Sequence, residues 1–403
     1  MTPAPLQHAV VVGGGPGGLM AAEVLAAGGL GVTVVDHMPS VGRKFLLAGR
    51  SGLNLTHSEP MEQMVARYGA QAGRLEPALR AFDAAALREW SAGLGEPTFV
   101  GTSGRVFPQS LRATSLLRAW LRRLGDLGVA FETRTRWIGW DVDALVVERN
   151  GERRALPADV TVLALGGASW PRVGSDGGWV PVLRAEGVEV HDLRPANCGI
   201  ELGWSTTFAD RHAGQPLKNV ELSIGGVTAR GDAVITATGM EAGPIYSLSA
   251  PIRDALDRGM AVLAVDLQPD LDEAQVAARL RRARPKDSLS STLKRTMGFS
   301  ATTVAWLREV VSGPLPSEPV ELAALVKEVP VHVQALVPLD RAISSAGGVA
   351  MHEVDDTFML HRRPNTYVVG EMLDWEAPTG GFLLQATFAT AVTAARAAVA
   401  RAR

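Results

Sequence analysis

Apolar positions at the start of the chain fall into two strand-like runs separated by one helix-like stretch. Ala9 to Val12 is a short apolar run of strand type, and Leu19 to Ala27 is a helical stretch rich in Ala and Leu. Gly31 to Val35 is a second apolar strand, which ends in Asp36. A glycine-rich turn joins the first strand to the helix. This order of strand, glycine turn, helix, strand and acid is what a dinucleotide-binding site requires.

The turn contains a G-x-G-x-x-G pattern with glycines at 13, 15 and 18. Gly13 permits the tight turn, Gly15 lets the backbone approach a pyrophosphate, and Gly18 allows close packing of helix on strand. The helix start offers unpaired N–H groups and a partial positive charge to phosphates. Asp36 can accept hydrogen bonds from ribose hydroxyls. The turn thus predicts a nucleotide site, whose candidate residues are Gly13, Gly15, Pro16, Gly17, Gly18 and Asp36.

The chain between these residues and position 190 alternates between helical and strand periodicity. Residues 62–123 are mostly helical, with a bent hairpin at 98–110, and residues 129–156 are expected to form a meander of four short strands. Residues 159–165 are a buried strand that ends in Gly166 and Gly167. Because G-x-G-x-x-G is missing there, we expect this loop to pass close to a ligand that the first turn already holds.

The remaining chain divides into an insert and a second α/β stretch. Residues 191–340 contain short strands at a spacing typical of a small barrel or sandwich, followed by helices. Near the end, residues 367–369 form a buried strand that leads into Gly370 and Glu371, and Gly380 and Gly381 precede an Ala-rich helix. That helix start offers positive potential to a developing anion. We therefore expect one α/β domain from 1–190 and 341–403, with 191–340 inserted as a β-barrel plus helices.

Composition narrows the class of protein. The 403 residues carry a net charge of −2, with 46% hydrophobic and 20% charged residues, as in an ordinary soluble globular protein. Basic residues are spread along the chain, so nucleic acid is not an expected partner. No uninterrupted apolar run reaches about 18 residues, so no membrane span is expected. One cysteine, Cys198, excludes an intrachain disulfide and suits a cytoplasmic protein.

With both ends read, the chain resembles the HI0933-like family of bacterial FAD-binding flavoproteins. The matching stretches are Val11 to Ala22, Gly42 to Lys44, Asn54 to Thr56, Gly104 to Pro108, Ala164 to Gly177, Thr236 to Pro244, Ser345 to Val349 and Gly370 to Gln385. One departure is that Gly52 and Leu53 stand where the family often has an Arg-Cys pair before the Asn.

The resemblance implies a glutathione-reductase-like FAD domain formed by both chain ends. It assigns the ADP half of FAD to the first turn and Asp36, and the ribose and pyrophosphate region to Arg43 and Lys44. It places Glu371 on the ribityl chain. The further residues that the resemblance brings to the cofactor are Asn54, Gly166, Gly167, Gly370, Asp374, Gly380, Gly381 and Phe382.

These features predict an FAD-dependent oxidoreductase that transfers hydride between a small organic substrate and the flavin. NAD(P)H is the expected reductant, and it would visit the flavin transiently because no second G-x-G-x-x-G domain is visible. The alternatives are an FAD-dependent RNA-modifying protein and a non-catalytic flavin-binding protein.

Side chains for substrate chemistry give a weaker signal. The histidines at 57, 332, 352 and 361 are candidate acids or bases, but their scatter shows no metal-ligand spacing, so no metal is expected. Trp170 and Trp375 are the tryptophans most suited to a substrate pocket, whereas Cys198 is expected to be a buried, inert thiol. No catalytic residue is assigned.

Overall fold

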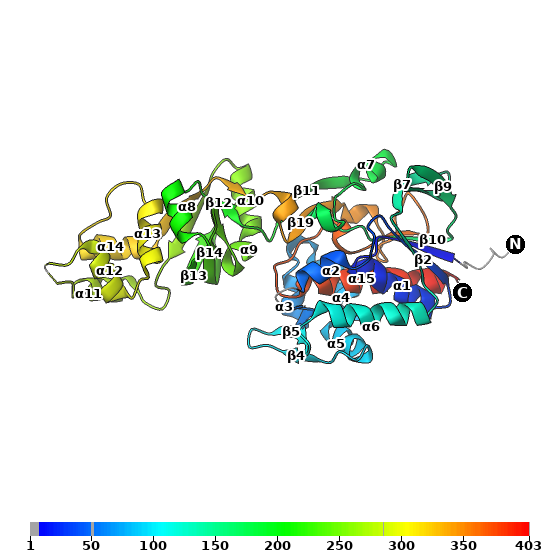
Figure 1. Cartoon of the computed structure of the whole chain (residues 1–403), viewed down its shortest axis with the longest axis horizontal. Coiled ribbons are helices and arrows are strands. Elements are labelled where there is room, and N and C mark those ends of the chain that lie inside the picture. The colour runs from blue at the N-terminus through cyan, green and yellow to red at the C-terminus, as the bar shows by residue number, and fades with distance from the viewer. Residues whose placement is uncertain (1–7, 50–51, 285, 403) are drawn as a thin grey trace. The chain divides into compact units, whose positions relative to one another are not determined.

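The computed structural model describes residues 8–49, 52–284 and 286–402, and its chain divides into two compact units. Unit 1 combines Met1–Arg194 with Ser344–Arg403, and unit 2 is Pro195–Ile343 (Figure 1). We predicted domain boundaries at residues 190 and 340. Those boundaries concern domains that fold independently, and they stay a prediction.

Unit 1 is built on a five-stranded parallel sheet in the order β20-β10-β1-β2-β6. Its strands are β1 (His8–Val12), β2 (Gly31–Asp36), β6 (Ala130–Thr133), β10 (Val160–Leu163) and β20 (Thr366–Val368). Residues 9–12 of β1 and all of β10 and β20 are buried, as expected for strands that helices or other layers cover on both faces. The predicted α/β class with a parallel, Rossmann-like sheet is confirmed.

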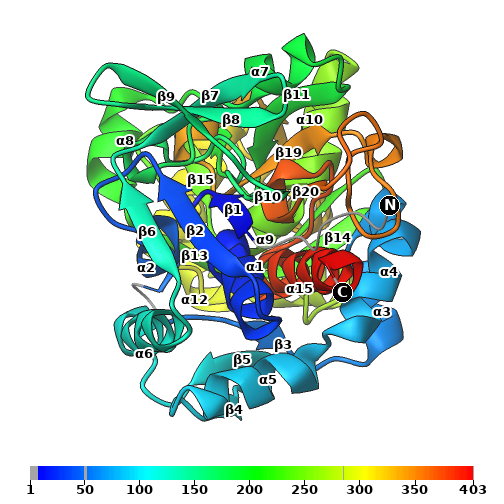
Figure 2. The same cartoon turned by 90° about the vertical axis from the view of Figure 1, so that its right-hand side faces the viewer.

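Two helices from opposite ends of the chain lie side by side against this sheet. They are α1 (Pro16–Ala27) and α15 (Phe382–Ala402) (Figure 2). A Cβ added at Gly17 would lie 3.2 Å from Thr387, whereas one at Gly28 would overlap the side chain of Val399. The first contact lies near the N-terminal ends of both helices and the second near their C-terminal ends, so the two helices run parallel. Small residues on the shared face permit this close approach.

Helix α15 also has the length and apolar composition to cross a membrane. In the described chain it is the one helix that passes this test, and 61% of its most apolar window is buried inside the protein. That burial is typical of the core helix of a globular unit, and the side chains of Thr387 and Val399 lie against α1.

One predicted strand pairs differently from expectation. Residues 129–132 were expected to open the meander, but β6 instead joins the edge of the parallel sheet beside β2. The meander has three antiparallel strands: β7 (Arg136–Asp141), β8 (Ala144–Arg149) and β9 (Glu152–Leu156). It lies on the opposite side of the parallel sheet from α1 and α15 (Figure 2).

The predicted helical region and hairpin are both present. The helices are α2 (Arg43–Ala48), α3 (Met61–Ala66), α4 (Ala72–Ala81), α5 (Ala84–Gly93) and α6 (Ala113–Asp126). The hairpin of β4 (Thr98–Val100) and β5 (Arg105–Pro108) gains a third strand, β3 (Thr56–His57). Unit 1 is completed by α7 (Val180–Ala185), by β11 (Val190–Ala196), whose last two residues belong to unit 2, and by β19 (Ser344–Val349), which pairs with β11.

Unit 2 has its own core around a seven-stranded sheet, in the order β17-β16-β13-β14-β15-β12-β18. The strands are β12 (Ile200–Glu201), β13 (Pro216–Ile224), β14 (Val227–Ile235), β15 (Gly239–Glu241), β16 (Ala261–Asp266), β17 (Val329–Val333) and β18 (Ala335–Leu336). The helices are α8 (Thr206–His212), α9 (Gly243–Ser247), α10 (Ser249–Asp257), α11 (Glu273–Leu280), α12 (Leu289–Met297), α13 (Ala301–Val310) and α14 (Pro319–Lys327). Closure of the sheet into a barrel stays a prediction.

Candidate cofactor site

The parallel sheet gathers the predicted site residues at one edge. Strands β1, β2, β10 and β20 are parallel, so the loops that follow them leave the same edge. The chain from β1 continues to β2 on one side, whereas β10 lies on the other side of β1. Such a change of direction opens a crevice outside the carboxyl ends of the strands, which is where α/β sheets bind nucleotides.

The three motif glycines meet different surroundings. A Cβ at Gly13 would overlap the carbonyl oxygen of Ala164, and one at Gly18 would overlap the carbonyl oxygen of Gly13. A Cβ at Gly15 would meet no atom of the described residues within 4 Å. Gly13 and Gly18 therefore permit packing of the protein on itself, whereas Gly15 faces open space at the start of α1.

The start of α1 is exposed to that open space. Pro16 occupies the first helical turn, and no side chain of the described residues caps the helix at Gly15. Proline is favoured at this position because its missing N–H would have no partner inside the helix. The other N–H groups of the first turn are left for an anion. Gly17 brings this turn close to α15.

Asp36 is held at the end of β2 by backbone groups. Its Oδ2 accepts a hydrogen bond from the N–H of Gly14 at 2.8 Å, and its Oδ1 accepts one from the N–H of Met38 at 2.7 Å. Burial raises the pKa of Asp36, while these two N–H groups act in the opposite direction. Each oxygen keeps acceptor capacity for a ribose hydroxyl.

Lys44 of helix α2 links two loops of the edge, those that follow β10 and β20. Its Nζ donates to Glu371 Oε2 at 2.9 Å and to Ser169 Oγ at 2.7 Å. The N–H of Ser345 donates to the other Glu371 oxygen at 2.7 Å, and Ser345 Oγ accepts from the N–H of Ala168 at 2.9 Å. Ser345 thus joins the loops after β10 and β20. The sequence showed only a run of small residues there and gave Ser345 no role.

Close packing explains the glycines of these two loops. A Cβ at Gly167 would overlap the side chain of Ser345, and one at Gly370 would lie 3.2 Å from Thr387 of α15. Gly166 has φ of +71°, a conformation that favours glycine. The backbone here can therefore pass close to its neighbours and to a ligand.

The start of α15 is pinned to β3. Gly381 has φ of +99°, and a Cβ there would lie 2.5 Å from the carbonyl carbon of Thr56. Thr56 Oγ1 also donates to Gln385 Oε1 at 2.6 Å. Gly380, with φ of +134°, is the other buried glycine of this turn. Phe382, the first residue of α15, precedes Thr387 by five residues, so α15 begins about 7.5 Å beyond the level of Gly17, at 1.5 Å per residue.

Phe382 is a packed residue of this edge. It is 4% exposed, its ring stacks on His57 with 5.2 Å between centroids, and the Arg67 guanidinium carbon lies 5.5 Å from its ring centre. Tyr68 OH donates to its carbonyl oxygen at 2.8 Å. These contacts fix the position of the Phe382 ring and of the helix start.

Asp374 pairs with a histidine that the sequence did not single out. His191 Nδ1 lies 2.8 Å from Asp374 Oδ2, and its Nε2 lies 3.1 Å from Glu189 Oε1. The hydrogen bond to Asp374, followed by that to Glu189, raises the pKa of His191. The spacing of 183 residues between His191 and Asp374 left no local pattern from which to find this pair.

One group of side chains has the donor spacing of a metal site. Donor atoms of Glu189, His352 and Glu353 lie within 4.8 Å of one another. Glu353 already accepts from the N–H of Glu189 at 3.1 Å and from Arg362 Nε at 3.2 Å. The group is therefore accounted for as an ion-pair and hydrogen-bond network.

The other candidates from sequence lie in ordinary surroundings. Trp375 is 2% exposed and donates to the Gly370 carbonyl oxygen at 2.8 Å, so it belongs to the core and not to a pocket surface. Trp170 is 37% exposed. Cys198 is buried, as expected. His332 lies on strand β17 of unit 2, and His361 is exposed in unit 1.

Two buried polar atoms test whether this edge fits FAD. Within the described residues, Arg43 Nε and Asn54 Oδ1 are buried and have no hydrogen-bond partner. One is a donor and the other an acceptor, and such groups are costly to leave unpaired. Together with the open space at Gly15, they fit a ligand that carries both anionic and donor groups, as FAD does.

A single family model covers nearly the full length of the chain. The HI0933-like protein Rossmann domain matches residues 7–397. The chain belongs to the HI0933-like family. This is a family of FAD-binding oxidoreductases, and this HI0933-like protein is an FAD-dependent oxidoreductase.

Similar proteins come from both sequence and structure. The HI0933-like protein is 27% identical to a 3-dehydro-bile acid delta(4,6)-reductase of Clostridium scindens, over 97% of this chain and 98% of that one. It shares the fold of 3-ketosteroid delta1-dehydrogenase from Sterolibacterium denitrificans (TM-score 0.55, 14% identity, 97% of this chain and 99% of that one). It also shares the fold of 3-ketosteroid-delta4-(5alpha)-dehydrogenase from Rhodococcus jostii RHA1 (TM-score 0.52, 16% identity, 100% and 98%).

Proposed function

We propose that the protein transfers hydride between bound FAD and a small apolar substrate that carries a C=C bond conjugated to a carbonyl group. Two observations on unit 1 carry this proposal: the open space before Gly15, and the buried Arg43 Nε and Asn54 Oδ1, which have no hydrogen-bond partner among the described residues. The full-length similarity to a bile acid reductase supports the substrate class. NAD(P)H is the proposed reductant, and the cytoplasm is the proposed location.

The proposed contacts to FAD follow from the position of each residue. Gly15, Pro16 and Gly17 would bring the α1 start to the pyrophosphate. Asp36 would accept from the adenosine ribose, while Arg43 would use its unpaired Nε on the phosphate or ribose side. These contacts would form the N-terminal half of the glutathione-reductase-like arrangement that we propose for the two chain ends.

A second set of residues would position the flavin half of the cofactor. Asn54 Oδ1 would accept from a donor of the flavin or its ribityl chain. Lys44 holds Glu371 in place for the ribityl hydroxyls. Gly166 and Gly167 would let the backbone pass beside the flavin.

FAD, when bound, supplies the hydride chemistry, and the protein supplies position and electrostatics. The start of α15 presents the positive end of a helix dipole at Gly380 and Gly381, where a negative charge is stabilised. Asp374 and Glu189 keep His191 protonated to higher pH than usual, so a cation stays near this edge.

The test is an anaerobic titration of the purified, FAD-loaded protein with NADH and with NADPH, monitored by flavin absorbance. A 3-oxo-4-ene steroid and a short acyclic enone are then added as oxidants. We expect either NADH or NADPH to bleach the flavin absorbance, and we expect the steroid to restore it. If only dithionite bleaches the flavin and the steroid restores its absorbance, NAD(P)H is excluded as the reductant, and the proposed substrate class is retained. No recovery with either enone would overturn the proposal and favour a non-catalytic flavin protein.

A further inference from the structure

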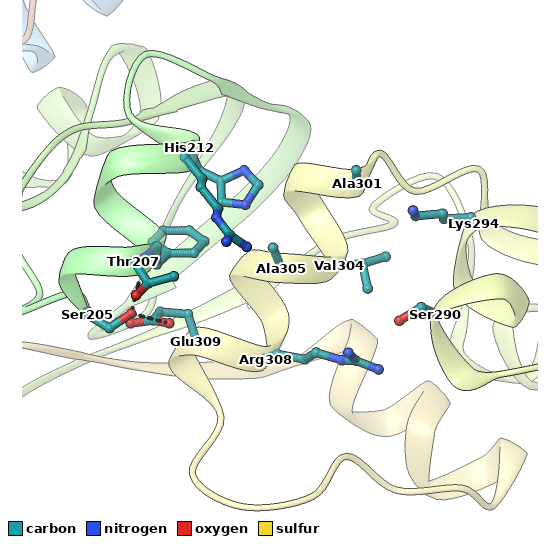
Figure 3. A pocket seen from close by; sticks show the side chains of 12 residues that line it. Ser205, Thr207, His212, Ser290, Lys294, Ala301, Val304, Ala305, Arg308 and Glu309 are labelled. Carbon is teal, nitrogen blue, oxygen red and sulfur yellow. Dashed lines mark hydrogen bonds between the residues drawn. The ribbon is translucent and has the colours of Figure 1, made fainter.

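Unit 2 contains a cavity of about 340 Å³ between helices α8, α12 and α13 (Figure 3). Each helix contributes one face. Positions 301, 304, 305 and 308 of α13 are three and four residues apart, which places them on the same side of the helix. Phe208 and Val304 are buried, and with Ala305 they form an apolar part of the wall.

Each of the three helices also brings one cation to this cavity. They are Arg211 of α8, Lys294 of α12 and Arg308 of α13, and all three are exposed. Lys294 points toward α13, and Arg308 extends toward α12 (Figure 3). In the part of the chain that the structure describes, no carboxylate forms an ion pair with any of the three.

The wall contains one carboxylate, Glu309, against these three cations. Glu309 Oε1 accepts from the N–H of Ser205 at 2.6 Å, and its Oε2 accepts from the Ser205 hydroxyl at 3.1 Å. Glu309 is thus occupied at the start of α8. The cavity keeps an excess of positive charge, which attracts anions.

A simpler explanation is that cations favour the last turn of any helix, where they oppose the dipole. Lys294 and Arg295 both lie in the last turn of α12, and they allow a comparison. Arg295 forms an ion pair with Asp287, while its neighbour Lys294 points at the cavity. The dipole does not explain why one cation from each helix lines the same space.

We propose that this cavity binds a small organic anion with two or more phosphate or carboxylate groups. Arg211, Lys294 and Arg308 would hold the anionic groups, because charge-assisted hydrogen bonds are the strong ones. The hydroxyl of Ser290, which also points toward α13, adds a donor (Figure 3). Phe208 and Val304 would cover the apolar part of the ligand.

The test is isothermal titration calorimetry of the full chain saturated with FAD, so that the cofactor site is closed to the probes. Inorganic pyrophosphate and citrate are titrated separately. We expect one saturable site, with Kd raised about ten-fold in Lys294→Gln and again in Arg308→Gln, since each loses a charged hydrogen bond. Tighter binding of pyrophosphate would indicate recognition of phosphate groups, and tighter binding of citrate would indicate recognition of carboxylate groups.

The matched control is Arg282→Gln, which removes an exposed arginine of unit 2 outside the cavity wall. It should leave Kd unchanged, and melting curves should show that all variants fold. Absence of saturable binding by both probes would overturn the proposal. Equal loss of affinity in Arg282→Gln would do the same, because it would show binding to general surface charge.

Discussion

Single residues of the first turn divide into those that the fold needs and those that only a ligand needs. Gly18 faces the Gly13 carbonyl, and a side chain there has no room. Gly15 has φ of −80° and ψ of −177°, a conformation that any residue adopts, and nothing in the described chain fills the space before it. The sequence motif requires glycine at both positions. In the structure, packing on the protein itself explains Gly18, whereas space for a ligand explains Gly15.

Gly15→Ala should therefore leave the FAD-free protein intact and impair cofactor binding. Its Cβ enters space that the pyrophosphate would occupy. We expect the melting temperature of the FAD-free protein to stay within about 2 °C and FAD affinity to fall at least about ten-fold. The measurements are a thermal melt and a titration of FAD fluorescence.

Gly18→Ala is the contrasting variant at the same turn. Its Cβ would overlap a carbonyl oxygen, so the FAD-free protein should itself lose about 1–3 kcal/mol of unfolding free energy. Equal stability of Gly15→Ala and Gly18→Ala without FAD would contradict our reading of the turn.

Asn54 offers a second test at this scale, because its buried Oδ1 has no partner within the described residues. Asn54→Ala removes an acceptor that no described residue uses. FAD affinity should fall about five- to ten-fold, while the stability of the FAD-free protein should hold or rise. Equilibrium dialysis with FAD and urea unfolding measure the two quantities. An unchanged FAD affinity in equilibrium dialysis would show that Asn54 does not bind the cofactor.

At the scale of elements, His191 connects β11 to the loop after β20 through Asp374. Because its pKa is raised in the folded state, its contribution is fully present below the unfolded pKa of about 6.5 and is lost as pH rises through the folded value. Half of its side chain is exposed, so the contribution should stay below about 1 kcal/mol.

His191→Gln should accordingly be less stable than the parent at about pH 5.5 and equally stable at about pH 9. Urea unfolding at the two pH values gives the difference, and an NMR titration of the His191 ring gives its pKa directly. If the loss of unfolding free energy in His191→Gln instead grew as the pH rose, protonated His191 would not stabilise the fold through Asp374.

The elements that could be predicted from sequence are those whose pattern is local. The strand, glycine turn, helix and acid of residues 8–36 lie where periodicity placed them, and the Ala-rich helix α15 does too. Pairing partners could not be predicted. Nothing in residues 130–133 tells that β6 pairs with β2 and not with the adjacent β7. Strand β14 runs through Gly231 and Asp232, with Gly231 opposite Val220, although neither residue type favours a strand.

The site followed the same rule. The places of Gly15 before α1 and of Asp36 at the end of β2 could be predicted, because the motif states their spacing. The contacts of Lys44 with Glu371, and of His191 with Asp374, join residues far apart in the chain. Only the folded sheet brings such pairs together, so no window of sequence contains them.

At the scale of the whole molecule, all the proposed FAD contacts belong to unit 1, and the anion cavity belongs to unit 2. A ligand that binds only the folded state stabilises it by mass action, by about 2.7 kcal/mol at a hundred-fold excess over Kd. Each unit has its own core, so two unfolding transitions are possible.

We expect calorimetry to show two transitions, of which FAD raises one and pyrophosphate the other. Limited proteolysis during the melt assigns each transition to its unit. A single transition that shifts equally with either ligand would show that the two cores unfold together.

The pairing of β11 with β19 has one more consequence. The chain leaves unit 1 at Arg194 and returns at Ser344, close to the ends of two strands that are hydrogen-bonded to each other. A short turn could join these ends without disturbing the parallel sheet. Residues 195–343 would then form a cassette that can be removed or replaced while unit 1 keeps its own core. A shortened chain with such a turn that still turns yellow with FAD would make this cassette available to protein engineering.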